Sequence, residues 1–270
     1  GRGQKLRPTP VKTAAKELGL PVLEPQRPRE IIADLEKLDA DAFAVASYGR
    51  ILPHALLDLP RLGAFNVHPS LLPFYRGATP LQAQIRDLCT TTGVTIMKMD
   101  AGMDTGDILL QEQTPLGSRE TYGELEARLA DLGAQLLARV LEIAERGKLK
   151  PVPQDDLASP EATRATLTRP LHSSDLRIDW TRSATFVDAF VRSLSPQPAA
   201  RGSIGGVACK IVAVHPIEGD GGAPGSLVRM PRGVAVTCAE GAVAIDRVIP
   251  ANRSVMSGEA FAASLFAAEK

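Results

Sequence analysis

The order of apolar patterns along the chain constrains its fold more than any other feature. Up to about residue 150, short apolar runs alternate with helical patterns. Continuous apolar runs are typical of strands covered on both faces, and they occur at 42–46, 63–67 and 94–97, with a further strand expected at 108–113. Apolar residues three and four positions apart predict helices at 11–18, 28–38, 79–88 and 122–143, and a short strand is expected at 21–23. This alternation predicts an α/β domain at 1–150.

The second part of the chain has a different pattern. Pro151, Pro153 and Pro160 interrupt the segment 151–170, which we interpret as a linker crossing the surface. After a helix expected at 183–194, short β-type runs broken by glycine follow at 204, 208–214, 225–228, 234–237 and 242–245. They predict a small all-β domain at 171–270, built as a barrel.

Charge and cysteine content limit the partners and the compartment. The 31 basic and 31 acidic side chains cancel, so the whole chain has no net attraction to nucleic acid or anionic membrane. The first sixteen residues nevertheless hold five cations and no acid: Arg2, Lys5, Arg7, Lys12 and Lys16. The 3 cysteines are odd in number and far apart, which favours a reducing cytoplasm, and no apolar stretch is long enough to span a bilayer. None of the 4 histidines has a partner at metal-ligand spacing, so we expect no metal.

The segment Asn66–Pro73 contains the first candidate site. On a strand, residues i and i+2 face the same side, so the side chains of Asn66 and His68 point together. They stand at the end of an expected buried strand, where open α/β sheets bind their ligands. An amide and an imidazole in this position could donate hydrogen bonds to an oxyanion. An isolated Asn-x-His is also compatible with polar groups that are satisfied by nearby backbone.

The second candidate is the loop from Asp100 to Asp107. Asp100, Asp104 and Asp107 lie there among glycines. Carboxylates in a loop suit calcium, but their spacing does not match an EF-hand. A turn rich in Asp and Gly is also common without any function.

Together, the two segments resemble the signatures of the 10-formyltetrahydrofolate-dependent formyltransferase family. Asn66–Pro73 with Tyr75-Arg76-Gly77 is similar to its first signature, and Asp100–Asp107 to its second. The resemblance implies a Rossmann-like formyltransferase domain followed by an OB-like C-terminal domain. It is nearest to the members that formylate methionyl initiator tRNA, because Gly1–Leu6 resembles their basic loop. Further similar segments are Ser47–Pro53, Pro153–Asp155, Arg177–Trp180 and Ser195–Pro198.

The resemblance also implies roles for individual residues. Asn66 and His68 would donate hydrogen bonds to the formyl oxygen, and Asp104 would raise the pKa of His68 and relay a proton. Ser70 to Pro73 would shape the site rather than react. The folate would contact Tyr48, Gly49, Ile51, Leu52, Ser70, Leu71, Leu72, Pro73, Gly102, Thr105, Gly106 and Asp107. Arg2 and Lys5 would contact the tRNA. The formyl donor would be 10-formyltetrahydrofolate, with no metal, and the enzyme would be a cytoplasmic monomer.

One departure and three alternatives accompany this hypothesis. Family members have a strand, a helix and a second strand before the basic loop, so we expect an upstream segment that this sequence lacks. A formyltransferase for amino-sugar nucleotides would share both signatures. A purine-pathway formyltransferase would lack the β-domain. A non-catalytic tRNA-binding protein would not need Asn66, His68 and Asp104 together.

Overall fold

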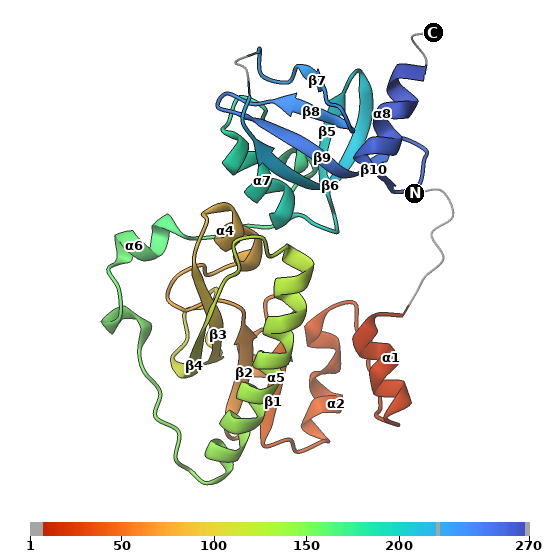
Figure 1. Cartoon of the computed structure of the whole chain (residues 1–270). Helices are drawn as coiled ribbons and strands as arrows, with labels where there is room; N and C mark the ends of the chain where they lie inside the picture. Colours follow the sequence, from red (N-terminus) through yellow and green to blue (C-terminus); the bar gives the residue numbers. More distant parts are fainter. Residues whose placement is uncertain (1–7, 220–221, 268–270) are drawn as a thin grey trace.

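Two β-sheets follow one another along the chain, each packed against helices (Figure 1). The computed structural model describes residues 8–219 and 222–267. The first sheet has the order β1-β2-β3-β4, with strands β1 (Ala42–Ala46), β2 (Gly63–His68), β3 (Thr91–Lys98) and β4 (Ile108–Pro115). Its helices are α1 (Pro10–Glu17), η1 (Pro28–Ile31), α2 (Ile32–Glu36), α3 (His54–Leu57), α4 (Pro80–Arg86) and α5 (Tyr122–Glu145). The predicted α/β architecture is confirmed.

The pairing of β2 determines where the neighbouring loops begin. β1 runs parallel to β2, so the loops that follow these two strands leave from the same edge of the sheet. β3 runs antiparallel to β2 and to β4, which makes the sheet mixed. The prediction that both faces of β1 are covered is wrong, because β1 ends the strand order and its Ala44 and Ala46 are exposed.

Helix α5 covers the first sheet. It begins with a capping box, in which Thr121 Oγ1 accepts from the Glu124 amide and the Glu124 carboxylate accepts from the Thr121 amide. Its buried stripe packs on β2 and β3 in one core with Phe65, Val94, Ile96, Leu125, Leu129, Leu136 and Val140. The apolar spacing in the sequence predicts this helix correctly.

The N-terminal helices depart from the expected pattern. Instead of one helix over 28–38, a 3₁₀ turn at η1 leads into α2, which ends at Glu36. Residues 21–23 form no strand. These segments carry the expected apolar residues but no buried side chain, so packing does not extend them into longer elements.

The segment 151–170 contains two short helices, η2 (Gln154–Asp156) and α6 (Pro160–Ala165). It lies against the first unit: Ile108 and Val152 exchange both backbone hydrogen bonds at 2.9 Å, and Gly77 bridges to Thr168.

The second unit is a curved antiparallel sheet of order β5-β6-β9-β8-β7, with β10 paired to β9. Its strands are β5 (Ala200–Ile204), β6 (Val207–Ile217), β7 (Leu227–Arg229), β8 (Val234–Thr237), β9 (Ala242–Pro250) and β10 (Met256–Ser257). Register shifts in β6 between Ile211 and Val214 interrupt its pairing with β9 and bend the strand. The result is a half-barrel, as the OB-like expectation requires. The helices η3 (Ser173–Leu176), α7 (Ala184–Ser193) and α8 (Gly258–Phe266) belong to this unit, and α8 is absent from the sequence prediction.

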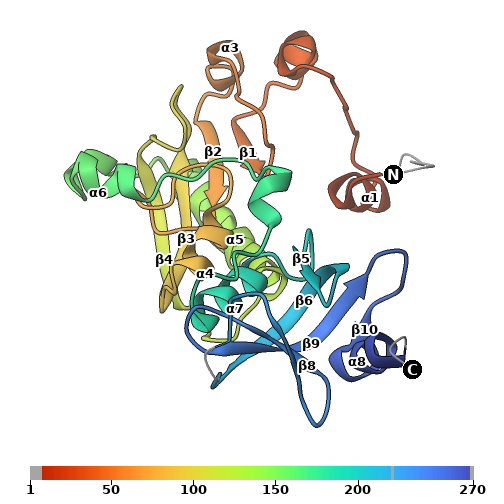
Figure 2. The ribbon, with the colours of Figure 1, turned by 90° about the horizontal axis from the view of Figure 1, so that it is seen from above.

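Polar contacts join the two units. Asp188 on α7 is buried and pairs with Arg192 at 2.9 Å and with Arg119 of the first unit at 2.7 Å. Arg119 also donates to the Val214 carbonyl at 2.8 Å, and Arg192 to the Glu120 carbonyl at 3.1 Å. Figure 2 shows α4 of the first unit beside α7 of the second, and the two helices are in contact. No helix in the described ranges is long and apolar enough to cross a membrane.

Candidate active site

The site is built around the last residue of β2. His68 is 3% exposed, and its Nε2 lies 2.9 Å from the Tyr75 carbonyl oxygen. A carbonyl only accepts hydrogen bonds, so Nε2 carries the proton and donates it. Asn66 lies two residues earlier on the same strand and is only partly buried. The alternation of the strand therefore places an amide and an imidazole on one side of the sheet.

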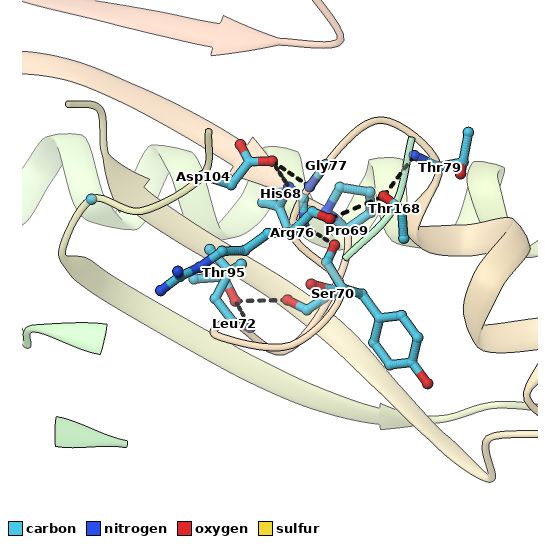
Figure 3. A network of polar contacts seen from close by, with 12 residues as sticks. His68, Pro69, Ser70, Leu72, Arg76, Gly77, Thr79, Thr95, Asp104 and Thr168 are labelled. Carbon is cyan, nitrogen blue, oxygen red and sulfur yellow. Dashed lines mark hydrogen bonds and ion pairs between the residues drawn. The ribbon is translucent and has the colours of Figure 1, made fainter. Parts of the chain in front are cut away.

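Asp104 comes from the loop between β3 and β4. Its Oδ2 lies 3.6 Å from His68 Nδ1 and accepts a 2.8 Å hydrogen bond from the Gly77 amide (Figure 3). The backbone of Asp104 is left-handed, with φ of 56°. The loop is compact, because a Cβ on Gly106 would lie 1.7 Å from the Lys98 carbonyl oxygen. Two segments that are distant in the sequence thus meet at His68.

Burial and charge act in opposite directions on His68. Burial lowers the pKa of His68 and is the largest effect, Asp104 and the Tyr75 carbonyl raise that pKa, and Arg76 lowers it. Asp104 therefore acts on the His68 pKa in the predicted direction, but burial outweighs it and the net shift of the pKa is downward. A neutral ring with its proton on Nε2 presents the Nδ1 lone pair toward Asp104.

Hydrogen bonds within the loop after His68 and to strand β3 hold that loop in place. Ser70 is fully buried, and its hydroxyl donates to the Phe74 carbonyl at 2.7 Å. Thr95 on β3 donates to the Ser70 carbonyl at 2.7 Å and accepts from the Leu72 amide at 3.2 Å. The Ser70 hydroxyl thus donates to a backbone carbonyl and not to a base that would activate it as a nucleophile.

The other residues expected at the folate site fall into two groups. Tyr48, Gly49, Ile51 and Leu52 lie in the loop after β1, where Tyr48 is 42% exposed and Ile51 88%. The parallel pairing of β1 with β2 starts this loop at the edge of the sheet where His68 ends. The second group, Gly102, Thr105, Gly106 and Asp107, belongs to the Asp104 loop, where Thr105 donates to the Asp100 carboxylate at 2.8 Å. Leu71 and Pro73 flank the buried Leu72 in the loop after β2.

Sequence reasoning missed two residues that contact the site, Gln154 and Thr168. Gln154 hydrogen-bonds the Asp104 loop and Arg76, while Thr168 hydrogen-bonds the Arg76 carbonyl. All three contacts are long-range. The only hint in the sequence is Gln154, an uncharged amide side chain that lies between Pro153 and Pro160 in a stretch with the composition of a linker.

Two further expectations concern other parts of the chain. Arg2 and Lys5 lie outside the described residues. Within 8–219 and 222–267, no group of three or more His, Cys, Asp or Glu could hold a metal ion.

A basic hollow of about 830 Å³ lies in the second unit, away from His68. We define it by its four exposed cations, Arg177, Arg201, Lys210 and Arg253, together with Trp180. Among the described residues that line it, none has an acidic side chain.

Comparison with known proteins gives matches along the chain. Residues 1–141 match the family model "Formyl transferase", and residues 170–265 match "Formyl transferase, C-terminal domain". The methionyl-tRNA formyltransferase of Stutzerimonas stutzeri is 40% identical over 265 residues, which cover 97% of this chain and 82% of that protein. That of Gluconobacter oxydans is 43% identical over 266 residues, which cover 97% and 84%.

Solved structures share the fold at low sequence identity. HypX from Aquifex aeolicus in complex with tetrahydrofolic acid matches with a TM-score of 0.68 and 19% identity, over 89% of this chain and 41% of that one. The N-formyltransferase from Helicobacter canadensis, in complex with folinic acid and dTDP-3-aminofucose, matches with a TM-score of 0.65 and 17% identity, over 87% and 82%. With both family models matched in order and relatives near 40% identity over almost its whole length, the chain belongs to the formyl transferase family.

Proposed function

We propose that this enzyme transfers the formyl group of 10-formyltetrahydrofolate to the α-amino group of methionine on initiator tRNA. The observation that carries the proposal is the set of relatives named methionyl-tRNA formyltransferase, which match 97% of the chain at 40–43% identity. The complexes of the structural neighbours with tetrahydrofolic acid and folinic acid support a folate donor.

Formyl transfer needs proton movement near a reacting carbonyl. The donor supplies an activated formyl group, the attacking amine must lose a proton, and the leaving nitrogen must gain one. The neutral His68 ring can accept a proton at Nδ1, where Asp104 Oδ2 lies 3.6 Å away and stabilises the imidazolium. His68 and Asp104 therefore form the proposed proton-transfer pair.

Asn66 is the proposed oxyanion donor. The formyl oxygen gains negative charge when the amine attacks, and a side-chain amide fixed on a strand stabilises that charge without reorganising. Asn66 is only partly buried, unlike Phe65 and His68 on the same strand. His68 would add a second donor when Nδ1 is protonated.

The proposed folate site lies between the loops that follow β1, β2 and β3. Tyr48 and Ile51 offer exposed apolar surface to a flat ring, and Leu52 and Gly49 complete that loop. Leu72 packs with Met97, Met99 and Ile108 in a small apolar cluster beneath the loop after β2. Backbone groups in the segments of Leu71, Pro73, Gly102, Thr105, Gly106 and Asp107 would supply polar contacts.

The basic hollow supports a polyanionic acceptor. Its four cations and the absence of acid among its lining residues favour phosphate contacts, although the formal net charge of the chain is zero. Trp180 provides a planar apolar surface. Arg2 and Lys5 are the proposed contacts at the acceptor end.

One observation supports a second class of formyl acceptor. The Helicobacter canadensis enzyme, crystallised with dTDP-3-aminofucose, shares this fold over 82% of its length. An amino-sugar nucleotide is therefore the alternative substrate.

The deciding experiment supplies 10-formyltetrahydrofolate with charged initiator tRNA in one assay and with amino-sugar nucleotides in another. We expect formyl-methionyl-tRNA only, with chelator leaving the rate unchanged. The variant His68→Ala controls for uncatalysed transfer. Formylation of the sugar alone would refute the tRNA assignment.

A further inference from the structure

The interdomain segment carries a buried side chain that contacts both loops of the candidate site. Gln154 is 2% exposed and opens η2. Its Nε2 donates to the Asp104 carbonyl at 3.0 Å and to the Gly106 carbonyl at 2.7 Å. Its Oε1 accepts from Arg76 Nε at 3.0 Å and from Arg76 Nη2 at 2.7 Å.

These contacts use the full hydrogen-bonding capacity of the amide. A side-chain amide has two N–H donors and two acceptor sites on its oxygen, and all four are occupied. The partners determine its orientation, since the guanidinium only donates and the carbonyls only accept. A buried polar group with all its hydrogen bonds made specifies one geometry. Replacing one of its donors by an acceptor costs free energy, because the buried partner loses its hydrogen bond.

The groups that Gln154 contacts determine the position of Asp104. The Asp104 backbone has a φ of 56°, which a non-glycine residue adopts only when its surroundings hold it there. Gln154 holds the carbonyl of that residue. On the opposite side it holds Arg76, whose neighbour Gly77 donates to the Asp104 carboxylate at 2.8 Å.

The same segment fixes Gly77 from a second direction. The Thr168 amide and hydroxyl both donate to the Arg76 carbonyl, at 2.8 and 3.0 Å, and the Thr79 amide donates to the Thr168 hydroxyl at 3.1 Å (Figure 3). A Cβ on Gly77 would lie 2.1 Å from the Thr168 carbonyl oxygen, so the two backbones are in direct contact. The loop that receives Asp104 is thus held independently of Gln154.

We infer that Gln154 is a positioning residue for formyl transfer, which holds the Asp104 carboxylate beside His68 and the Gly77 amide. The inference rests on the proposed function only in taking His68 and Asp104 as the reacting groups. Gln154 is buried and its hydrogen-bonding positions are all occupied, so it acts through Asp104. The segment 151–170 is then part of the active-site architecture as well as a connection between units.

Two variants test the inference. Gln154→Met keeps the length of the side chain and removes every hydrogen bond. Gln154→Glu keeps an oxygen that accepts from Arg76. It replaces the NH₂ group that donates to the Asp104 and Gly106 carbonyls with a carboxylate oxygen, which cannot donate to them. In both variants we expect kcat to fall by about 10- to 100-fold, because small displacements of a reacting group cost that much. The KM values for folate and tRNA should stay within about twofold. Asp155→Asn, an exposed neighbour in the same turn, is the matched control.

Amide hydrogen exchange supplies a readout that does not depend on the acceptor. If Gln154 positions Asp104, its loss exposes the Gly77 amide, which bonds to the Asp104 carboxylate, while the amide of Ile96 in β3 keeps its exchange rate. A merely structural role would accelerate both amides together. Wild-type kcat in Gln154→Glu, or Gly77 exchange that changes only in step with Ile96, would overturn the inference. If the native enzyme fails to formylate tRNA, the proposed function falls, and the exchange comparison still decides the role of Gln154.

Discussion

At the scale of single residues, His68 is the group on which the chemistry depends. Its ring is buried, Nε2 bonds to the Tyr75 carbonyl, and Nδ1 faces Asp104. We expect His68→Ala to lower kcat by about 10²- to 10⁴-fold, the usual contribution of a general acid–base group. Folate affinity, measured by equilibrium binding, should stay within about threefold because the loops after β1 and β3 remain. His215→Ala, an exposed histidine on β6, is the control. Near-normal turnover in His68→Ala would mean that the reacting group lies elsewhere.

The pH dependence follows from the forces on the same ring. Burial lowers the pKa of His68 below its usual 6.5, so the neutral, proton-accepting form persists below that pH. The rate should therefore fall on the acid side with an apparent pKa under 6.5. Asp104 raises the His68 pKa, so Asp104→Asn should move the acid limb to still lower pH while it reduces kcat. A pH profile of kcat/KM for both proteins between about pH 4.5 and 8 checks this, because kcat/KM reports groups of the free enzyme and this range spans the usual titration of histidine. An acid limb that moves upward in Asp104→Asn would contradict the assignment.

The two residues His68 and Gln154 show what a sequence can reveal at this scale. Asn66 and His68 are two positions apart, so the alternation of a strand predicts their common direction. Gln154 contacts Asp104 and Arg76 across 50 and 78 positions of the chain, and no local period encodes such a contact. The direction of the His68 pKa also depends on how deeply tertiary packing buries the ring, which the motif does not report.

At the scale of elements, α5 and β2 approach each other at a glycine. A Cβ on Gly133 would lie 2.6 Å from Val67 Cγ1, and Val67 stands between Asn66 and His68 on β2. Gly133→Ala gains helix propensity of about 1 kcal/mol, but the clash with a β-branched side chain costs about 1–3 kcal/mol. We expect a net loss in the free energy of unfolding, measured by urea denaturation, and a lower kcat from the displaced strand.

The double variant Gly133→Ala with Val67→Ala distinguishes the clash from other effects. Removing the Val67 methyls makes room for the new Cβ, so the pair should be more stable than the sum of the single changes by at least about 0.5 kcal/mol. Strictly additive changes would show that the helix does not press on the strand at this point.

Elements with strong internal signals were predictable, and elements that depend on neighbours were not. The capping box at Thr121 and the stripe from Leu125 to Val140 define α5 from its own sequence. The run Ala42–Ala46 is equally apolar, yet β1 lies at the end of the strand order, where burial depends on neighbouring elements. The sequence pattern does not predict helix α8, because its apolar residues follow one another almost continuously and do not form a stripe on one face.

At the scale of the whole molecule, the two units meet through side chains as well as through the connecting segment. Arg119 reaches from the first unit to Asp188 and to the Val214 carbonyl, and α4 contacts α7. The segment 151–170 meanwhile bonds back to the candidate site at Gln154 and Thr168. Composition alone indicated a surface linker there, because proline content reports on regular structure and not on what a segment touches. One connection therefore serves both the arrangement of the units and the geometry at Asp104.

The distribution of charge, rather than its sum, determines how the whole enzyme should respond to salt. The formal net charge is zero, but the basic hollow gathers four cations. Each phosphate contact releases a counterion, so the affinity for uncharged initiator tRNA, measured by filter binding, should fall linearly on a log–log plot against KCl. The double variant Arg201→Ala with Lys210→Ala should reduce that slope by about two units, roughly one for each lost phosphate contact. Arg146 is an exposed arginine at the end of α5, and Arg146→Ala should leave the slope unchanged. The KM for the folate should stay the same in the double variant and in Arg146→Ala. A double variant with the wild-type slope would show that the tRNA backbone lies on another surface, because cations that touch phosphates cannot be removed without changing the number of counterions released.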